Sequence, residues 1–216
     1  MLKLDTTQAA AADNITAQIS EPGKYIGTIT RAEKLVSKDK GTMGLGLSFK
    51  ADNGQTAEYL DLYHTKGTGE ALSGLKTVNA VMCCAKVKQA EEGAVQVEKW
   101  DSTAGARRKM NVTGYPALMY KRIGLLLRKT LETDNKGKDR ERLEIFGVFD
   151  PETEMTASEI LSRATEPQKL AAMLDVLIAR GVIDKRTSRA PVRQPQQSAG
   201  IDRFDDVPAF DDDIQF

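Results

Sequence analysis

Alternating apolar and polar residues predict β-strands over the first two thirds of the chain. Residues 25–36 are long enough for one strongly bent strand, with Gly27 at a bulge. The string "LGLSF" then places three apolar side chains on one face, Asn53-Gly54 supplies hairpin-turn chemistry, and "TAEYLDLYH" returns. The pattern therefore predicts a bent strand followed by a hairpin.

The returning strand carries two kinds of side chain on its two faces. Leu60 and Leu62 share one face, because side chains alternate along a strand, and this places Tyr59 and Tyr63 on the other. If the leucines are buried, the tyrosines lie on the open face of the sheet.

A change of period follows at residues 68–87, where apolar residues recur every three or four positions and predict an amphipathic helix. A short strand at Val95 and Val97, the Gly/Ser loop "KWDSTAGARRKMN", and the strands "KRIGLLLRKTLE" and "LEIFGVF" come next, with an irregularity near Gly147. Three strands, a helix and at least two strands is the element order of a five-stranded Greek-key barrel of the OB type. A small mixed sheet of another topology is the alternative.

The chain beyond Pro151 reads as helical and then unstructured. "TASE" at residues 156–159 is a capping box, and a second helix starts near Thr165 and stops at Gly181. Its apolar stripe is formed by Leu170, Met173, Leu174, Leu177 and Ile178. We therefore expect a mainly β protein with some α: an arm at 1–20, an OB-like domain at 21–150, helices packed on the barrel at 151–184, a basic Pro/Gln-rich linker at 185–200 and a disordered acidic tail at 201–216.

The charge of the chain is uneven although its net charge is zero. Residues 201–216 hold six Asp against one Arg, whereas residues 185–200 hold four Lys or Arg and no acid. Residues 99–142 hold twelve Lys or Arg against five Asp or Glu, an excess of +7. A basic region and an acidic end are therefore both present.

Several functional classes lack the residues they need. The chain has one histidine, His64, and no phosphate-binding, dinucleotide-binding or zinc motif, so we expect neither an enzyme nor a cofactor or metal site. Cys83 and Cys84 are adjacent, which is unsuitable for an ordinary structural disulfide. No window approaches the roughly 20 apolar residues of a membrane span, and no signal peptide is seen. We expect a soluble protein of the bacterial cytoplasm that does not bind membranes.

Single-stranded nucleic acid is bound by cations along the backbone and by flat side chains that stack on bases. Tyr59, Tyr63 and Trp100 are the stacking candidates; a structural role in the sheet and packing of the tryptophan are the alternatives. The cations are expected in a loop, along a strand and at a hairpin tip, where the alternative is a merely solvated surface. They are Arg107, Arg108, Lys109, Lys121, Arg122, Arg128, Lys129, Lys138, Arg140 and Arg142. Together they predict a cation-lined cleft.

The acidic tail has two predicted uses. As a tethered polyanion it can compete with nucleic acid for the cationic cleft. Its tip also forms an apolar knob with negative charge, suited to a pocket ringed by Lys or Arg on a partner protein. The partner-binding residues are Asp211, Asp212, Asp213, Ile214 and Phe216.

The tip "DDDIQF" resembles the C-terminal end of bacterial single-stranded DNA-binding proteins, usually Asp-Asp-Asp-Ile-Pro-Phe; Gln215 replaces the proline here. The body is similar to a family of phage-encoded single-stranded DNA-binding proteins through "LKLDT", "ADN", "ISEPGKYIGTITRAE", "GTMGLGLSFKADNGQTAEYLDLY" and "TASEIL". Such relatives often carry a tryptophan late in the third strand, where this chain has Tyr63. The resemblance implies an OB-fold, coating of single-stranded DNA during replication and recombination, and recruitment of enzymes by the tail.

We therefore expect a non-enzymatic protein that protects single-stranded DNA without strong sequence preference. One alternative is an interaction or decoy protein whose tail engages host replication enzymes while its barrel never meets DNA. The other is a single-stranded RNA-binding module, because stacking does not depend on the sugar. The sequence leaves the oligomeric state open, a homo-oligomer included.

Overall fold

The computed structural model describes residues 4, 6, 18–101, 103–134 and 137–186. The predicted linker at 185–200 lies almost entirely outside the described residues, as does most of the predicted arm. The acidic tail, with Asp211, Asp212, Asp213, Ile214 and Phe216, lies wholly outside them. The chain divides into two units, residues 1–186 and 187–216.

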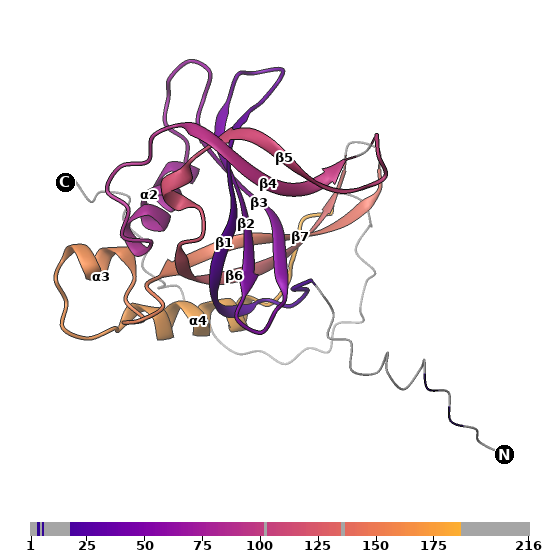
Figure 1. The fold of residues 1–216 in the computed structure, drawn as a ribbon. Coiled ribbons are helices and arrows are strands. Elements are labelled where there is room, and N and C mark those ends of the chain that lie inside the picture. The colour runs from indigo at the N-terminus through magenta and orange to yellow at the C-terminus, as the bar shows by residue number, and fades with distance from the viewer. Residues whose placement is uncertain (1–3, 5, 7–17, 102, 135–136, 187–216) are drawn as a thin grey trace. The chain divides into compact units, whose positions relative to one another are not determined.

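The first unit is mainly β, as the alternating pattern predicts (Figure 1). The helices among the described residues are α2 (Gly74–Cys84), α3 (Ala157–Leu161), α4 (Lys169–Arg180) and the 3-10 turn η1 (Pro116–Leu118). Its strands are β1 (Gly23–Val36), β2 (Met43–Ala51), β3 (Thr56–Thr65), β4 (Gly93–Asp101), β5 (Ala106–Gly114), β6 (Arg122–Thr133), β7 (Asp139–Phe149) and β8 (Ile183–Asp184). No helix among the described residues is long and apolar enough to cross a membrane.

The long strand β1 organises the sheet. Its first half pairs with β6 and its second half with β2, both antiparallel, and Glu33 pairs with Gly114 of β5. The predicted bulge at Gly27 is wrong, because the register shifts between Ile29 and Arg31 instead. Gly27 instead allows the backbones of β1 and β2 to lie close together, because a Cβ there would lie 2.1 Å from the carbonyl oxygen of Lys50.

The eight strands form one sheet that stays open. Its path runs β3-β2-β1-β5-β4, while β6 pairs with β1, β7 and β8. β3 and β7 contact each other, yet no strand pairing joins them in the described part of the chain. The closed five-stranded barrel of the sequence prediction is therefore not seen.

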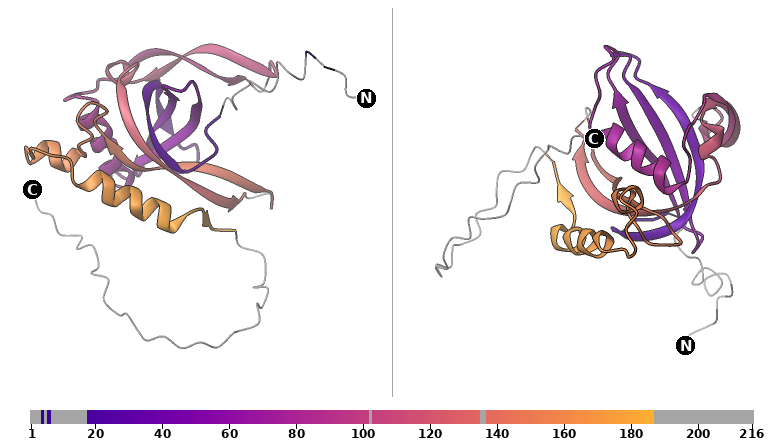
Figure 2. Two further views of the ribbon diagram at one scale, coloured as in Figure 1. Left: turned by 90° about the horizontal axis from the view of Figure 1, so that it is seen from below. Right: turned by 90° about the vertical axis from the view of Figure 1, so that its left-hand side faces the viewer.

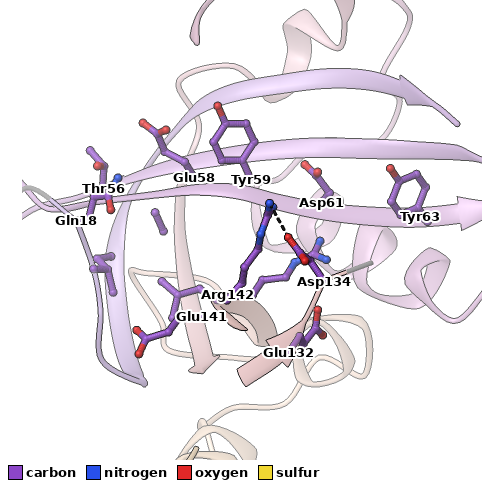
Figure 3. Close-up of a pocket in the computed structure, with 14 residues that line it drawn as sticks. Gln18, Thr56, Glu58, Tyr59, Asp61, Tyr63, Glu132, Asp134, Glu141 and Arg142 are labelled. Atoms are coloured by element: carbon purple, nitrogen blue, oxygen red, sulfur yellow. Dashed lines mark ion pairs between the residues drawn. The ribbon is translucent and has the colours of Figure 1, made fainter. Parts of the chain in front are cut away.

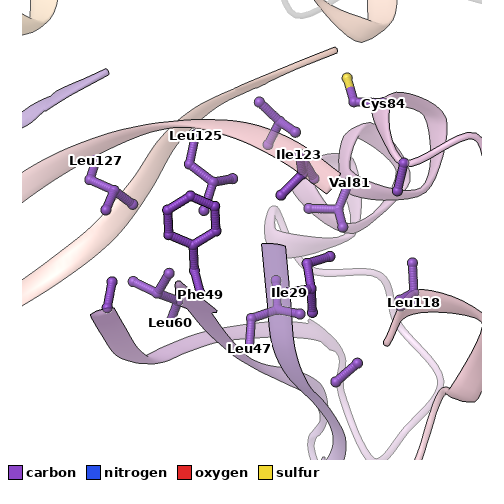
Figure 4. Packing of buried hydrophobic residues seen from close by; sticks show 14 of the residues in the cluster. Ile29, Leu47, Phe49, Leu60, Val81, Cys84, Leu118, Ile123, Leu125 and Leu127 are labelled. Atoms are coloured by element: carbon purple, nitrogen blue, oxygen red, sulfur yellow. The ribbon is translucent and has the colours of Figure 1, made fainter. Parts of the chain in front are cut away.

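The main core lies inside the curve of this sheet (Figure 4). Leu45, Leu47 and Phe49 of β2 are all buried, which confirms the predicted face. Ile123 and Leu127 of β6 meet them from across the core. Because β6 is also buried on its other face through Leu126, it reads as a nearly continuous apolar run.

The helices cover different parts of the sheet (Figure 2). α2 is shorter than the predicted helix at residues 68–87 and buries Val81 and Cys84 in the main core. The predicted capping box is confirmed, with Thr156 and Glu159 bonded reciprocally at the start of α3. α4 packs against β1 and β7 and forms a second apolar cluster with Leu126 of β6 and Phe149 of β7.

The predicted loop "KWDSTAGARRKMN" is wrong, because these residues form most of the β4–β5 hairpin. Trp100 pairs with Arg107, and Lys99 with Arg108, in an unbroken antiparallel ladder. Asp101 makes the turn by accepting hydrogen bonds from the backbone N–H groups of Thr103 and Ala104. The β4–β5 and β6–β7 hairpins extend in the same direction on either side of β1–β3 (Figure 2).

Candidate nucleic-acid interface

A groove of about 590 Å³ lies between β3 and the β6–β7 hairpin (Figure 3). Gln18 and Ile19 close one end, where Ile19 N–H donates to the Thr56 carbonyl at 2.9 Å. The open face of β3 forms one wall, and residues of β6, β7 and their connection form the other. The charged and aromatic lining residues are Glu58, Tyr59, Asp61, Tyr63, Glu132, Asp134, Arg140, Glu141 and Arg142.

Tyr59 and Tyr63 are both in this groove, on the face opposite buried Leu60, as the alternation predicts. They are 46% and 43% exposed, so each ring presents surface to solvent. Tyr59 has a positive φ of 57° at an irregularity in the β2–β3 pairing, a conformation that bulky residues rarely adopt. Such an outlier at a groove is a reason to suspect function.

Two glycines of β2 allow flat groups to lie against the sheet. A Cβ on Gly44 would come 3.0 Å from Cδ1 of the Tyr63 ring, and one on Gly46 would come 2.7 Å from Nη2 of Arg31. The Arg31 guanidinium in turn lies 5.5 Å from the centroid of the Tyr59 ring, within cation–π range. Gly46, Arg31 and Tyr59 are thus packed in succession from the sheet outward.

Ion pairs fix Arg31 in this position. Its Nε donates to Glu33 at 2.7 Å, and Lys99 Nζ of β4 donates to the other Glu33 oxygen at 2.8 Å. Burial alone would raise the pKa of Glu33, but the hydrogen bonds from Lys99 and Arg31 outweigh it and lower the pKa. Asp61, 3.6 Å from Arg31, has its pKa raised by burial against the attraction of that arginine. No hydrogen bond joins Asp61 Oδ1 to Arg31 Nη1, so they interact through charge alone.

The opposite wall carries the predicted hairpin-tip arginines. Arg140 pairs with Asp134 at 2.8 Å. The positive charge of Arg142 lies close enough to Asp61 to oppose the rise in the pKa of that carboxyl. Lys129 of β6 pairs with Glu141 at 2.8 Å. Two predicted arginines and both predicted tyrosines therefore line the same groove.

The β4–β5 hairpin contacts Glu58, one of the groove-lining residues of β3, although no described residue of the hairpin lines the groove itself. Arg107 of β5 forms an ion pair with Glu58 of β3, and Glu98 lies 3.4 Å from the same guanidinium. The hydrogen bond with Glu58 raises the pKa of Arg107, although partial burial opposes it. Trp100, directly opposite Arg107 in the hairpin, is 56% exposed, so it presents surface to solvent and is not part of the core.

Apart from Arg140 and Arg142, none of the predicted cations is among the groove-lining residues. Arg122 pairs with Asp52 at 2.8 Å, beside a second, smaller hollow, and Lys121 precedes it. Arg128 pairs with Glu144 at 2.6 Å. The remaining predicted cations, all exposed, are Arg108, Lys109 and Lys138. The cation run of the sequence is thus divided among several places.

The charge of the groove differs from the predicted cation-lined cleft. Five carboxylates and two arginines line it among the described residues. Three of these carboxylates, Glu58, Asp134 and Glu141, pair with a predicted cation. The correction has a simple cause: the sequence shows where cations lie along the chain, but not which distant carboxylates the fold brings to them.

Sequence reasoning missed Arg31, Glu33, Glu58, Asp61 and Lys99 as parts of this site. Arg31 and Glu33 do carry a signal in the sequence, because they are opposite charges two positions apart and therefore lie on the same face of one strand. Glu58 gives no such signal, because its role depends on a hairpin that the sequence pattern did not indicate.

The histidine and the cysteines are not among the residues that line the groove. No cluster of three or more His, Cys, Asp or Glu in the described part of the chain could hold a metal ion. Burial lowers the pKa of His64, and its Nδ1 lies 2.8 Å from the Thr65 hydroxyl. Burial also raises the pKa of Cys84 to about 12, which makes it a poor nucleophile.

No protein-family model and no curated protein matches this chain. No substrate or partner is therefore transferred from another protein. The groove between β3 and the β6–β7 hairpin carries the functional argument.

Proposed function

We propose that this protein binds single-stranded DNA without strong sequence preference and has no enzymatic role. The observation that carries the proposal is the pair of exposed rings, Tyr59 and Tyr63, set in one groove with Arg140 and Arg142. Stacking on such rings is worth about 1–3 kcal/mol per base and tolerates any sequence, because every base has a flat face. Arginines beside the rings supply partners for the phosphates.

The proposal includes an OB-type module. β1–β3, α2, β6 and β7 follow in the element order of that fold, with the β4–β5 hairpin inserted after the helix. On this reading the unpaired seam between β3 and β7 is the position of the DNA-binding groove. The inserted hairpin adds Trp100 and Arg107 at the edge of that groove.

We further propose that the tail recruits replication or recombination enzymes, as in the phage-encoded proteins that the sequence resembles. Ile214 and Phe216 supply an apolar tip next to three aspartates. Deleting residues 214–216 is expected to abolish capture of such an enzyme while ssDNA affinity stays within about twofold. An unchanged enzyme interaction would refute this role of the tip.

Titration with an oligo-dT strand and with a duplex of equal length, across a salt series, tests the proposal. We expect quenching of Tyr or Trp fluorescence by the single strand, and duplex binding at least roughly tenfold weaker. Affinity should fall with salt, with a slope of about −0.7 per phosphate contacted. No binding, or equal binding to both, would contradict the proposal, and an RNA competitor that displaces DNA at equal concentration would favour the RNA-binding alternative.

A further inference from the structure

Arg107 and Glu58 connect two parts of the molecule that are 49 positions apart in sequence. Arg107 belongs to the β4–β5 hairpin and Glu58 to the wall of the groove on β3. The Arg107 side chain is 43% exposed, whereas the Glu58 side chain is 15% exposed. The cation is therefore at the surface, while the carboxylate that holds it is sheltered.

The same arrangement recurs across the groove. Arg140 is exposed and bound by Asp134, whose side chain is mostly sheltered, at 2.8 Å. An incoming strand at either place meets a guanidinium that already has an anionic partner. A phosphate can reach such an arginine only by replacing the carboxylate, because both compete for the same N–H donors.

We propose that Glu58 occupies the place of a DNA phosphate in the unbound protein and releases Arg107 to the strand on binding. The inference rests on the proposed DNA-binding function and names the residue that sets its affinity and salt dependence. Glu58 keeps Arg107 next to the groove when no strand is bound. It also limits affinity, since the sheltered carboxylate loses its partner when the strand takes the arginine.

Such an exchange changes the number of counterions that are released when the strand binds. A phosphate neutralised by a free arginine releases about 0.7 of a counterion from a single strand. When the arginine leaves Glu58 to bind the phosphate, the freed carboxylate takes up a cation from solution. This uptake largely cancels the release of a cation from the phosphate. The contact with Arg107 then adds affinity but little salt dependence.

Glu58→Gln tests the exchange, because glutamine keeps the size of the side chain and removes its charge. We expect the Kd for oligo-dT to fall about three- to tenfold at low salt, and the salt slope to become steeper by about 0.7. Arg107→Gln should weaken binding with the slope nearly unchanged. A simple phosphate contact would instead lose about 0.7 of slope in that variant, and this result would overturn the exchange.

Glu152→Gln is the control for net charge, since Glu152 also forms an ion pair with a cation, Lys86, at 2.6 Å and is not among the groove-lining residues. It makes the same change in net charge, so equal tightening by both variants would overturn the specific role of Glu58. In the Arg107→Gln background, Glu58→Gln should give no gain in affinity. A gain that persists there would mean direct repulsion of the strand by Glu58 and would also overturn the proposal.

The outcomes separate this inference from the function on which it rests. A wild-type protein without preference for single strands refutes the proposed function. A wild-type protein that binds single strands, with Glu58→Gln at unchanged or lower affinity, refutes the exchange alone. If Glu58→Gln lowers the melting temperature by more than a few degrees, the exchange is tested by the salt slope of Arg107→Gln instead. The Arg107 side chain is 43% exposed, so its replacement disturbs the fold less.

Discussion

At the scale of single residues, the tyrosine rings of the groove depend on the glycines beneath them. Gly44 leaves room for the Tyr63 ring, and Gly46 leaves room for the Arg31 guanidinium that supports Tyr59. A side chain at either glycine would push these flat groups away from the sheet. The string "MGLGL" is therefore compatible with a strand whose apolar residues face the core and whose other face supports aromatic rings.

Tyr59→Ala and Tyr63→Ala should each weaken oligo-dT binding by about 1–3 kcal/mol, roughly five- to 150-fold, because each removes one stacking surface. Replacement by Phe should preserve most of the affinity, since the ring remains. Fluorescence anisotropy measures the change. Tyr120→Ala is the control: Tyr120 is strongly exposed and is not among the residues that line the groove, so its loss should leave the Kd within about twofold.

Glu159 is a second residue with a measurable role. Burial opposes its charge, but its carboxylate accepts backbone N–H bonds from Gln168, Thr156 and Lys169, which lower its pKa to about 2. Because the pKa is depressed on folding, the stabilisation is present above about pH 4.5 and is lost as the pH falls toward about 2. Glu159→Gln should lower the free energy of unfolding by about 2 kcal/mol at neutral pH. Urea melts should show this difference shrinking below about pH 4; a constant difference would contradict it.

At the scale of elements, the sequence pattern was informative wherever one face of a strand or helix is buried. The alternation of Leu45, Leu47 and Phe49 predicts the buried face of β2, and the capping box predicts the start of α3. The β4–β5 hairpin was not predicted, because residues 106–111 of β5 are all exposed and no alternation of apolar residues marks the strand. Only Asp101 and Gly105, at the turn, carry a local signal.

In α4, the predicted apolar stripe contains both buried and exposed residues. Leu177 is 3% exposed and packs with Leu126 and Phe149, whereas its neighbour Ile178 is 69% exposed. Leu177→Ala should destabilise the protein by about 2–5 kcal/mol, because it leaves a cavity beneath the helix. Ile178→Ala should change stability by less than about 0.5 kcal/mol. Chemical denaturation of both variants checks this, and equal effects would place the helix in a different rotation.

At the scale of the whole molecule, charge is the property that the sequence predicts least well. Residues 99–142 do carry an excess charge of +7. However, Glu33 of β1 and Glu58 of β3 form ion pairs with two of these cations, Lys99 and Arg107. These pairings join residues 66 and 49 positions apart. They depend on where two hairpins lie, so composition by segment could not reveal them.

Deleting residues 201–216 removes six Asp and one Arg and leaves the rest of the chain at +5. If the tail competes with DNA for the groove, the deletion should lower the Kd for oligo-dT by about three- to tenfold at low salt, and by much less at about 0.5 M salt, where charges are screened. A variant with the six Asp changed to Asn is the control for tail length. Weaker binding after deletion would show that the tail does not compete.

The open seam between β3 and β7 has a consequence for backbone dynamics. β2 is paired on both sides, by β1 and β3, whereas β3 between Ala57 and Tyr63 is paired only by β2 in the described part of the chain. Amide protons that point from β3 toward the seam should therefore exchange with solvent deuterium far faster than those of β2. A ligand lodged in the seam would slow that exchange, so the labelling rate along one strand edge reports occupancy without any dye or mutation.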